Sequence, residues 1–291
     1  MHTPYDGSSK LFQIGLKPLD LNEWIDVDGL LPAYLDEKER LWAEHPDEVF
    51  VAEAGTEDAQ AEVLELLAEH LPARFPDVYR RSGEAIEIVP ASRSVALGDS
   101  PALWTAARLV QEDVVLMRRG EADWRLAAGS LSFPSSWRLS EKFGRPIHEV
   151  HGPVPGFGAG TRNNELIARM FDHLQPRIPV IRWNWSIYND AALYHPEDGG
   201  GHRRFGLGER AESVFLRAER QTLRKLPRSG DILFTIRIYV DPLETLERQP
   251  DAPKIAGALS DQLLALDPDQ LAYKGLTKER DRLIARLREI G

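Results

Sequence analysis

His148 and His151 lie three residues apart in the stretch HEVHGPVPGF, at positions 148–157. An imidazole side chain binds metal ions and exchanges protons near neutral pH, so this pair is the first candidate for chemistry. The segment 152–155, Gly-Pro-Val-Pro, follows directly, and its proline rings fix the backbone angle φ. This turn could therefore hold the His151 side chain in one direction.

The histidine pair allows three interpretations. Zinc binding would need both imidazoles on one helical face and a third ligand such as Glu149. Pro146 and Pro153 oppose a continuous helix, and the spacing matches no zinc-protease motif. A haem ligand would have to be one neutral imidazole with a fixed direction, which the proline-stiffened turn could give His151. Both histidines could also be ordinary loop residues, and these residues alone leave all three interpretations open.

Composition excludes several kinds of chemistry. The 291-residue chain contains no cysteine, so it cannot form a disulfide, use a cysteine nucleophile, or hold an iron–sulfur cluster or a thiolate-ligated haem. Its formal net charge of −10 argues against nucleic acid or an anionic membrane surface as the main partner. No apolar run approaches the roughly 18 residues of a membrane span, and residues 1–19 lack the pattern of a signal peptide. We therefore expect a cytoplasmic protein.

Three segments alternate between apolar and polar residues, as strands of an antiparallel sheet do: 180–188, 213–221 and 231–240. In the first segment, Trp183 and Trp185 share the apolar face, and we expect both to be buried. If the three strands are neighbours, their polar residues line up on one face. These residues are Arg182, Asn184, Arg217, Glu219, Gln221 and Arg237.

The polar face has two interpretations. It could be a sheet surface in contact with solvent, or a polar wall that orients an anionic group, because the arginine fork matches a carboxylate. Haem carries propionate groups, so a polar wall and a haem-ligating His151 are compatible. Arg237 sits between apolar residues in the middle of its segment, and we expect it to pair with a propionate.

The remaining elements are expected from hydrophobic periodicity and flanking prolines. Strands are predicted at 114–118 and 124–131, and helices at 32–44, 57–74, 101–113, 162–174, 252–265 and 277–289. The predicted fold class is α+β, with an antiparallel sheet of about five strands and N-terminal and C-terminal helices packed around it. We expect a single domain over 1–291, with an N-terminal helical layer (1–100), a sheet core (101–245) and C-terminal helices (246–291).

Several long stretches together resemble a known family. They are QEDVVLM (111–117), SFPSSWRLSEKFGRPIHEVHGPVPGF (132–157), IRWNWSI (181–187), LRAERQTLRKLPRSGDILFTIRIYVDPL (216–243) and YKGL (273–276). In this order they resemble the haem-dependent oxidative N-demethylase α-subunit-like family, over almost the whole chain.

The resemblance implies a PAS-like fold that binds haem b. It also implies oxygen-dependent demethylation of a small methylated amine such as dimethylamine, with release of formaldehyde. Electrons would come from a separate NADPH-dependent reductase subunit. NADPH, FMN, a 2Fe-2S cluster and tetrahydrofolate are then expected only through partner subunits, which agrees with the absence of cysteine and of a dinucleotide-binding fingerprint in this sequence.

Site residues follow from the matching motifs. His151 opens the H-x-P-V-P-G stretch and is expected to be the haem-iron ligand, whereas His148 falls outside it. Arg182 and Asn184 stand in the R-x-N-W stretch and are expected, like Arg237, to bind the cofactor. Glu219, in the E-R-Q-T stretch, is expected to interact with the cationic amine as a catalytic residue. The alternative function is a haem-based gas or redox sensor, or another haem-binding protein without turnover, because fold alone does not fix function.

Overall fold

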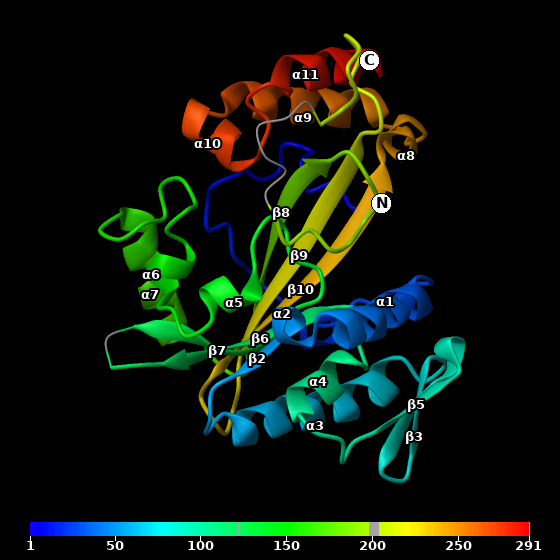
Figure 1. Cartoon of the computed structure of the whole chain (residues 1–291), viewed down its shortest axis with the longest axis vertical. Helices are drawn as coiled ribbons and strands as arrows, with labels where there is room; N and C mark the ends of the chain where they lie inside the picture. The colour runs from blue at the N-terminus through cyan, green and yellow to red at the C-terminus, as the bar shows by residue number, and fades with distance from the viewer. Residues whose placement is uncertain (122, 198–203, 291) are drawn as a thin grey trace.

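The computed structural model of the chain describes residues 1–121, 123–197 and 204–290, and within them a seven-stranded antiparallel sheet forms the centre (Figure 1). The strand order is β1-β8-β9-β10-β6-β7-β2. The strands are β1 (Lys17–Pro18), β2 (Phe50–Ala52), β6 (Asp113–Arg119), β7 (Trp124–Ser130), β8 (Val180–Tyr188), β9 (Phe215–Lys225) and β10 (Ile232–Pro242). The five strands predicted from the sequence form the unbroken core of this sheet. The predicted α+β class with a large antiparallel sheet is confirmed.

Helices pack around the sheet. They are α1 (Leu31–Glu44), α2 (Pro46–Val49), α3 (Glu57–Arg74), α4 (Ala102–Ala107), α5 (Leu139–Lys142), α6 (Ile147–Val150), α7 (Arg162–His173), α8 (Leu243–Glu247), α9 (Ala252–Ala265), α10 (Pro268–Tyr273) and α11 (Arg280–Arg288). Two of them, α7 and α10, are preceded by a residue whose side chain caps the helix. The side chain of Thr161 accepts a hydrogen bond from the Asn164 amide at the start of α7, and Asp267 forms a capping box with Gln270 at the start of α10.

The helix predictions succeed where the pattern is long. The predicted bounds 57–74 and 252–265 are those of α3 and α9. The prediction of a helix over 101–113 is wrong beyond α4, because Asp113 is already the first residue of β6. None of the helices in the described ranges combines the length and apolar character that a membrane span requires.

The sequence predicted a helical layer over residues 1–100, but this part of the chain also contains strands. Strands β3 (Tyr79–Ser82), β4 (Ala85–Ile88) and β5 (Arg93–Ala96) form a second, three-stranded antiparallel sheet. Ile86 and Ile88 are buried on either side of exposed Glu87, which is the two-residue period of a strand. Gly83 supplies the left-handed conformation (φ +59°) of the tight turn between β3 and β4.

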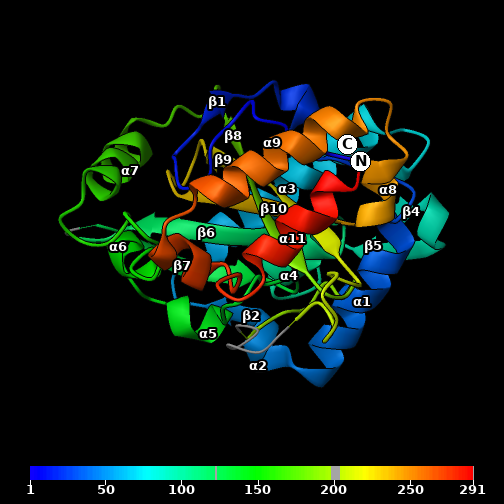
Figure 2. The ribbon, with the colours of Figure 1, turned by 90° about the horizontal axis from the view of Figure 1, so that it is seen from above.

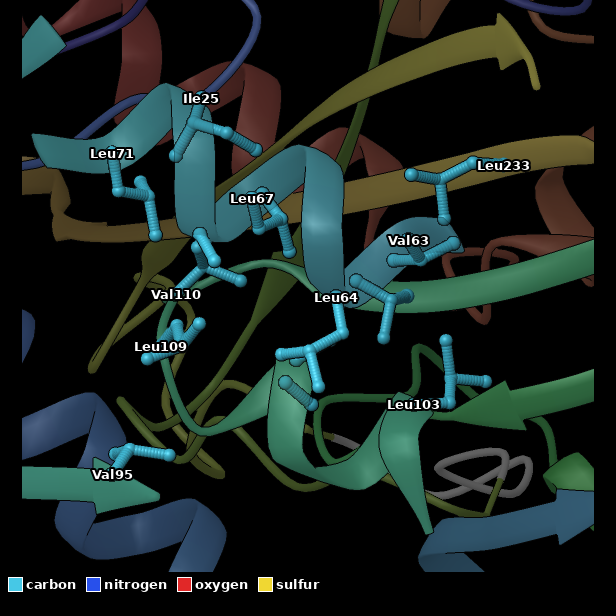
Figure 3. Close-up of a cluster of buried hydrophobic side chains, with 14 of the residues drawn as sticks. Ile25, Val63, Leu64, Leu67, Leu71, Val95, Leu103, Leu109, Val110 and Leu233 are labelled. Atoms are coloured by element: carbon cyan, nitrogen blue, oxygen red, sulfur yellow. The ribbon is translucent and has the colours of Figure 1, made fainter. Parts of the chain in front are cut away.

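Different helices lie at the two ends of the large sheet: α3 and α4 at one end and α9 and α11 at the other (Figure 1), and Figure 2 shows the end with α9 and α11 in front. At the first end, Leu233 lies in a buried cluster with Val63 and Leu67 of α3 and Leu103 of α4 (Figure 3). At the other end, Trp185 of β8 packs in a cluster that includes residues of α9 and α11. Both ends bury apolar surface, which is the main stabilising contribution to the fold.

Both tryptophans of β8 were expected to be buried, but only Trp185 is, with 2% of its surface exposed. Trp183 lies on the same face but is half-buried, and it packs against the rings of His2 and Tyr239. The predicted division of β8 into two faces therefore agrees with the structure, and the difference in burial arises because α9 and α11 cover Trp185.

The opposite face of the sheet carries Val115 and Ile236 and packs against the segment that contains α5, α6 and α7. This segment supplies Leu139, Ile147 and Phe171 to the buried cluster. It lies beside β7 and β8 in Figure 1 and brings the His151 turn to this face.

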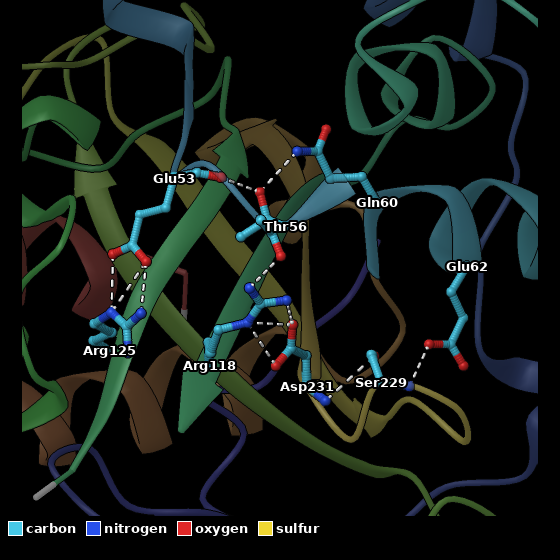
Figure 4. Close-up of polar contacts among 9 residues, drawn as sticks. Glu53, Thr56, Gln60, Glu62, Arg118, Arg125, Ser229 and Asp231 are labelled. Atoms are coloured by element: carbon cyan, nitrogen blue, oxygen red, sulfur yellow. Dashed lines mark hydrogen bonds and ion pairs between the residues drawn. The ribbon is translucent and has the colours of Figure 1, made fainter. Parts of the chain in front are cut away.

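Polar contacts connect the large sheet with α3 and with the segment that precedes α3 (Figure 4). Arg118 of β6 binds the Asp231 carboxylate with a shortest distance of 2.7 Å, and Arg125 of β7 binds Glu53 at the same distance. The buried Glu62 carboxylate of α3 accepts a hydrogen bond from the backbone amide of Ser229 in the β9–β10 turn. These contacts link β6 to the β9–β10 turn, β7 to the segment before α3, and the β9–β10 turn to α3.

Candidate functional site

Five of the six predicted polar residues share one face of β8 and β9, and only Arg237 does not. The register pairs Arg182 with Gln221 and Asn184 with Glu219. Residues directly opposite in an antiparallel pair project their side chains to the same side of the sheet. This is the face that also carries Ile236 and Ile238 of β10, and the α5–α7 segment covers part of it.

Arg237 does not belong to this face, and the prediction that it lines up with Arg182 and Glu219 is wrong. The register pairs Arg237 with Arg220, which in turn lies opposite Trp183, so all three project to the other side. Arg237 is fully buried, forms a 2.8 Å ion pair with Asp28, and stacks on neighbouring tyrosine rings. The predicted alternation of apolar and polar residues within β10 is correct, but alternation inside one strand does not give the register between neighbouring strands.

Arg217 shares the face of Glu219 but has a structural role. Its guanidinium donates to the backbone oxygens of Phe133, at 2.8 Å, and Leu193, at 3.1 Å. The side chain is buried and ties two loops to β9. Its donors are directed at these loops.

Glu219 is held by two side-chain amides. Its Oε2 atom accepts hydrogen bonds from Gln221 Nε2 at 2.9 Å and from Asn184 Nδ2 at 3.3 Å. The residue is 5% exposed, and its Oε1 atom is buried without a hydrogen-bond partner among the described residues. One oxygen therefore orients the carboxylate, and the other is available to a donor from a bound molecule.

Lys274 reaches the same cluster from the C-terminal helices. Its Nζ atom donates to the Trp185 carbonyl at 2.6 Å and to Asn184 Oδ1 at 3.3 Å. Burial lowers the pKa of Lys274 to about 8; the Glu219 charge opposes this shift and the Arg182 charge adds to it.

Sequence reasoning gave Lys274 no role, although it lies in the YKGL stretch. The next residue, Gly275, has φ +65°, and a Cβ atom there would lie 2.9 Å from Arg204 Nη1. A glycine is therefore needed to end α10 and to turn Lys274 toward β8.

Arg182 lies in the same environment without an ion pair. Its Nε atom is buried and has no hydrogen-bond partner within the described ranges. Burial lowers the pKa of the guanidinium, and the nearby Glu219 charge opposes that shift. Arg182 thus remains a cation with an unused donor, Nε, in a position that is partly shielded from water, where donors usually have partners.

His151 lies at the C-terminal end of α6. Its amide donates to the Ile147 carbonyl at 3.0 Å, and its own carbonyl accepts from Val154 at 2.8 Å, so the backbone is fixed on both sides. The Nδ1 atom is buried and unpartnered in the described structure, and the ring lies 6.1 Å from the Phe157 ring. Burial, together with the charges of Arg182 and Lys142, lowers the pKa of His151 to about 4. The imidazole is therefore neutral at physiological pH.

The neighbouring His148 has a different environment. It is part-exposed, and its Nδ1 atom lies 2.8 Å from the Asp123 carboxylate. Among the described residues, no three His, Asp or Glu side chains gather in a way that could hold a metal ion. The structure therefore separates the two histidines and places only His151 near Arg182.

An open cleft lies between the turn that follows His151 and α10. Its volume is about 620 Å³, within the roughly 300–1,000 Å³ typical of small-molecule sites. It is lined by Phe12, Pro153, Pro155, Gly156, Asn163, Asp267, Asp269, Gln270, Ala272 and Tyr273. The rings of Phe12 and Tyr273 meet edge to face at 5.9 Å, and Tyr273 also interacts electrostatically with Glu219 and Arg182. The cleft therefore adjoins the polar cluster of β8 and β9.

Phe12 has a left-handed backbone conformation, with φ +56°. Such a conformation is rare for a bulky residue and is often found where a side chain must be directed at a site. Its ring packs on Tyr273 and lies 5.7 Å from Lys274 Nζ. No periodicity in the sequence indicates this placement, because it depends on contacts between residues more than 250 positions apart.

Comparison with protein families identifies one match. The family model described as "Haem-dependent oxidative N-demethylase, alpha subunit-like" matches residues 15–284. The matched range contains the His151 turn, the polar cluster on β8 and β9, and Lys274. Because the match spans nearly the whole sequence, the chain belongs to the haem-dependent oxidative N-demethylase alpha subunit-like family.

Proposed function

We propose that this chain is the haem-binding subunit of an oxidative N-demethylase that acts on a small methylated amine, such as dimethylamine, and releases formaldehyde. The family match supports haem dependence and oxidative demethylation. The observation that carries the proposal is His151, a neutral imidazole on a fixed turn beside a cleft, with a buried nitrogen that has no partner in the described structure.

The scaffold supports the same proposal. If the five long strands are numbered along the chain, their order in the sheet is 2-1-5-4-3. This order, and helices packed beside an antiparallel sheet, support the PAS-like fold that the resemblance implies. On such a scaffold the cleft and His151 lie on the sheet face that also carries Glu219.

The residues around His151 fit haem b. A haem iron takes a neutral imidazole as axial ligand, and the state of His151 meets that requirement. Arg182 and Asn184 offer polar groups on the same side of the sheet, and Phe12 and Tyr273 offer aromatic surface. When bound, the haem would supply the redox chemistry with oxygen.

Glu219 is proposed to bind the ammonium form of the amine. The free Oε1 atom can accept an N–H donor, while Asn184 and Gln221 keep the carboxylate in place. A buried carboxylate compensates the charge of a cationic substrate, which would otherwise be costly to take out of water. Bound in this way, the substrate nitrogen and its methyl group would lie next to the sheet.

Electrons are proposed to come from partner subunits that carry NADPH, FMN, a 2Fe-2S cluster and tetrahydrofolate. The description of the family as an alpha subunit supports the existence of other subunits. The sequence supports the same division of labour, because it has no cysteine to hold a cluster.

A haem titration followed by a turnover assay tests the proposal. The purified chain with added haem is expected to show a Soret band of the histidine-ligated type. With a reductase, oxygen and dimethylamine, it is expected to release formaldehyde in step with NADPH consumption. Haem-loaded protein that binds oxygen but gives no amine-dependent turnover with several reductases would instead support a sensor.

A further inference from the structure

Arg182 and Lys274 are cations without a carboxylate partner. Neither forms an ion pair with a carboxylate of the described residues, although both side chains are partly shielded from solvent and the Arg182 Nε atom is buried. The nearest carboxylate, Glu219, bonds the amides of Asn184 and Gln221 through Oε2. Two positive charges and one negative charge leave the cluster with one uncompensated positive charge. Charges in such a position are normally paired, so a bound anion is the missing component.

The two cations are close enough to share one anion. Lys274 Nζ is bonded to Asn184 Oδ1 and to the Trp185 carbonyl, which fixes it above the middle of β8. Arg182 lies two residues before Asn184 on the same face, and two residues of a strand span about 7 Å. Because the long Arg182 side chain projects to the face on which Lys274 Nζ contacts Asn184, each cation can donate one charge-assisted N–H···O bond of about 2.8 Å to one carboxylate group.

We propose that Arg182 and Lys274 together form a binding site for a carboxylate group. The inference deepens the proposed function, on which the choice of ligand rests. One source of the carboxylate is a haem propionate. The other is the substrate itself, which would then be an N-methylated amino acid whose ammonium group binds Glu219 Oε1. Both sources use the same chemistry, and the two arms of the experiment distinguish them.

The first arm compares two porphyrins on the full-length chain. Iron protoporphyrin IX and its dimethyl ester differ only in the charge of the propionates, so their affinities report on carboxylate recognition. If a propionate is the ligand, the free acid is expected to bind at least about tenfold more tightly than the ester. Lys274→Met is expected to remove most of that preference, and Lys274→Arg to restore part of it. The acid-to-ester ratio would not change if Lys274 only supported the fold.

The second arm uses N-methylglycine and dimethylamine as small probes of thermal stability. If the substrate supplies the carboxylate, N-methylglycine is expected to raise Tm of the wild type more than dimethylamine does, and Lys274→Met is expected to lose that difference. The two porphyrins would then bind equally. The control for both arms is Lys254→Met, which removes an exposed lysine of α9 and is expected to behave as the wild type.

Failure of this inference is distinguishable from failure of the proposed function. If neither porphyrin gives a Soret band, the haem function is wrong. The Tm shift caused by N-methylglycine in the same protein then tests the carboxylate site independently of haem. Equal binding of acid and ester, together with no specific stabilisation by N-methylglycine, would overturn the inference. So would identical behaviour of Lys274→Met and Lys254→Met in both arms.

Discussion

Trp185→Ala is expected to be among the most destabilising single changes near the site. The ring is 2% exposed, lies edge to face with Tyr5 at 6.2 Å, and donates from Nε1 to Gln262 Oε1 at 3.3 Å. It thus joins β8 to the N-terminal segment and to α9. A buried tryptophan contributes about 200 Å² of surface, or roughly 5 kcal/mol at about 25 cal/mol per Å². Part of this area stays covered by the new alanine, so a loss of about 3–5 kcal/mol is expected.

Trp183→Ala is the matched control on the same face of the same strand. Trp183 is half-buried, and only part of its surface contacts His2 and Tyr239. Replacing it with alanine is therefore expected to lower the unfolding free energy by no more than about 2 kcal/mol. Urea unfolding of both variants and the wild type measures the two costs, provided that the slope m is unchanged. Equal costs for the two variants, or a cost below about 1 kcal/mol for Trp185→Ala, would contradict the packing described for this face.

Three further predictions concern charge. Glu219→Gln is expected to lower the rate of formaldehyde release well below that of the wild type while haem content stays near normal, which paired turnover and absorbance measurements would show. Arg237→Met is expected to cost about 1–3 kcal/mol of unfolding free energy, because the part-exposed Asp28 loses its ion pair and the Ile238 carbonyl loses one donor, and to leave haem affinity unchanged. Haem retention is expected to be constant from pH 8 to about 5 and to fall only near pH 4 or below, because the lowered pKa of His151 and its bond to the iron both disfavour protonation; loss of haem between pH 7 and 6 would count against His151 as ligand.

Much of the scaffold could be predicted because its signals are local. The segment 180–188 alternates over its whole length and forms β8 with those bounds. The helix at 57–74 and the helix at 252–265 have long patterns with clear ends. The small sheet that begins at Tyr79 was missed because its strands have only four residues each, too few for a clear alternation.

The candidate site was less predictable because it depends on relations between distant segments. Arg182, Asn184 and Glu219 come together as expected, since they lie on adjacent strands whose polar faces were recognised. Arg237 was assigned to the wrong side because register between strands cannot be read from alternation in each. Lys274 enters the cluster only through tertiary contacts with Trp185 and Asn184, which no local pattern encodes.

The most direct test of the account is a visible absorption spectrum of the purified protein with added haem, recorded for the wild type, His151→Ala and His148→Ala. The two histidines are three residues apart, but only His151 lies beside Arg182 with a buried ring nitrogen that has no partner in the described structure, whereas His148 pairs with Asp123. The wild type and His148→Ala are expected to show the same histidine-type Soret band at equal haem content, and His151→Ala to lose it. A Soret band that survives in His151→Ala and disappears in His148→Ala would contradict the assignment of the site.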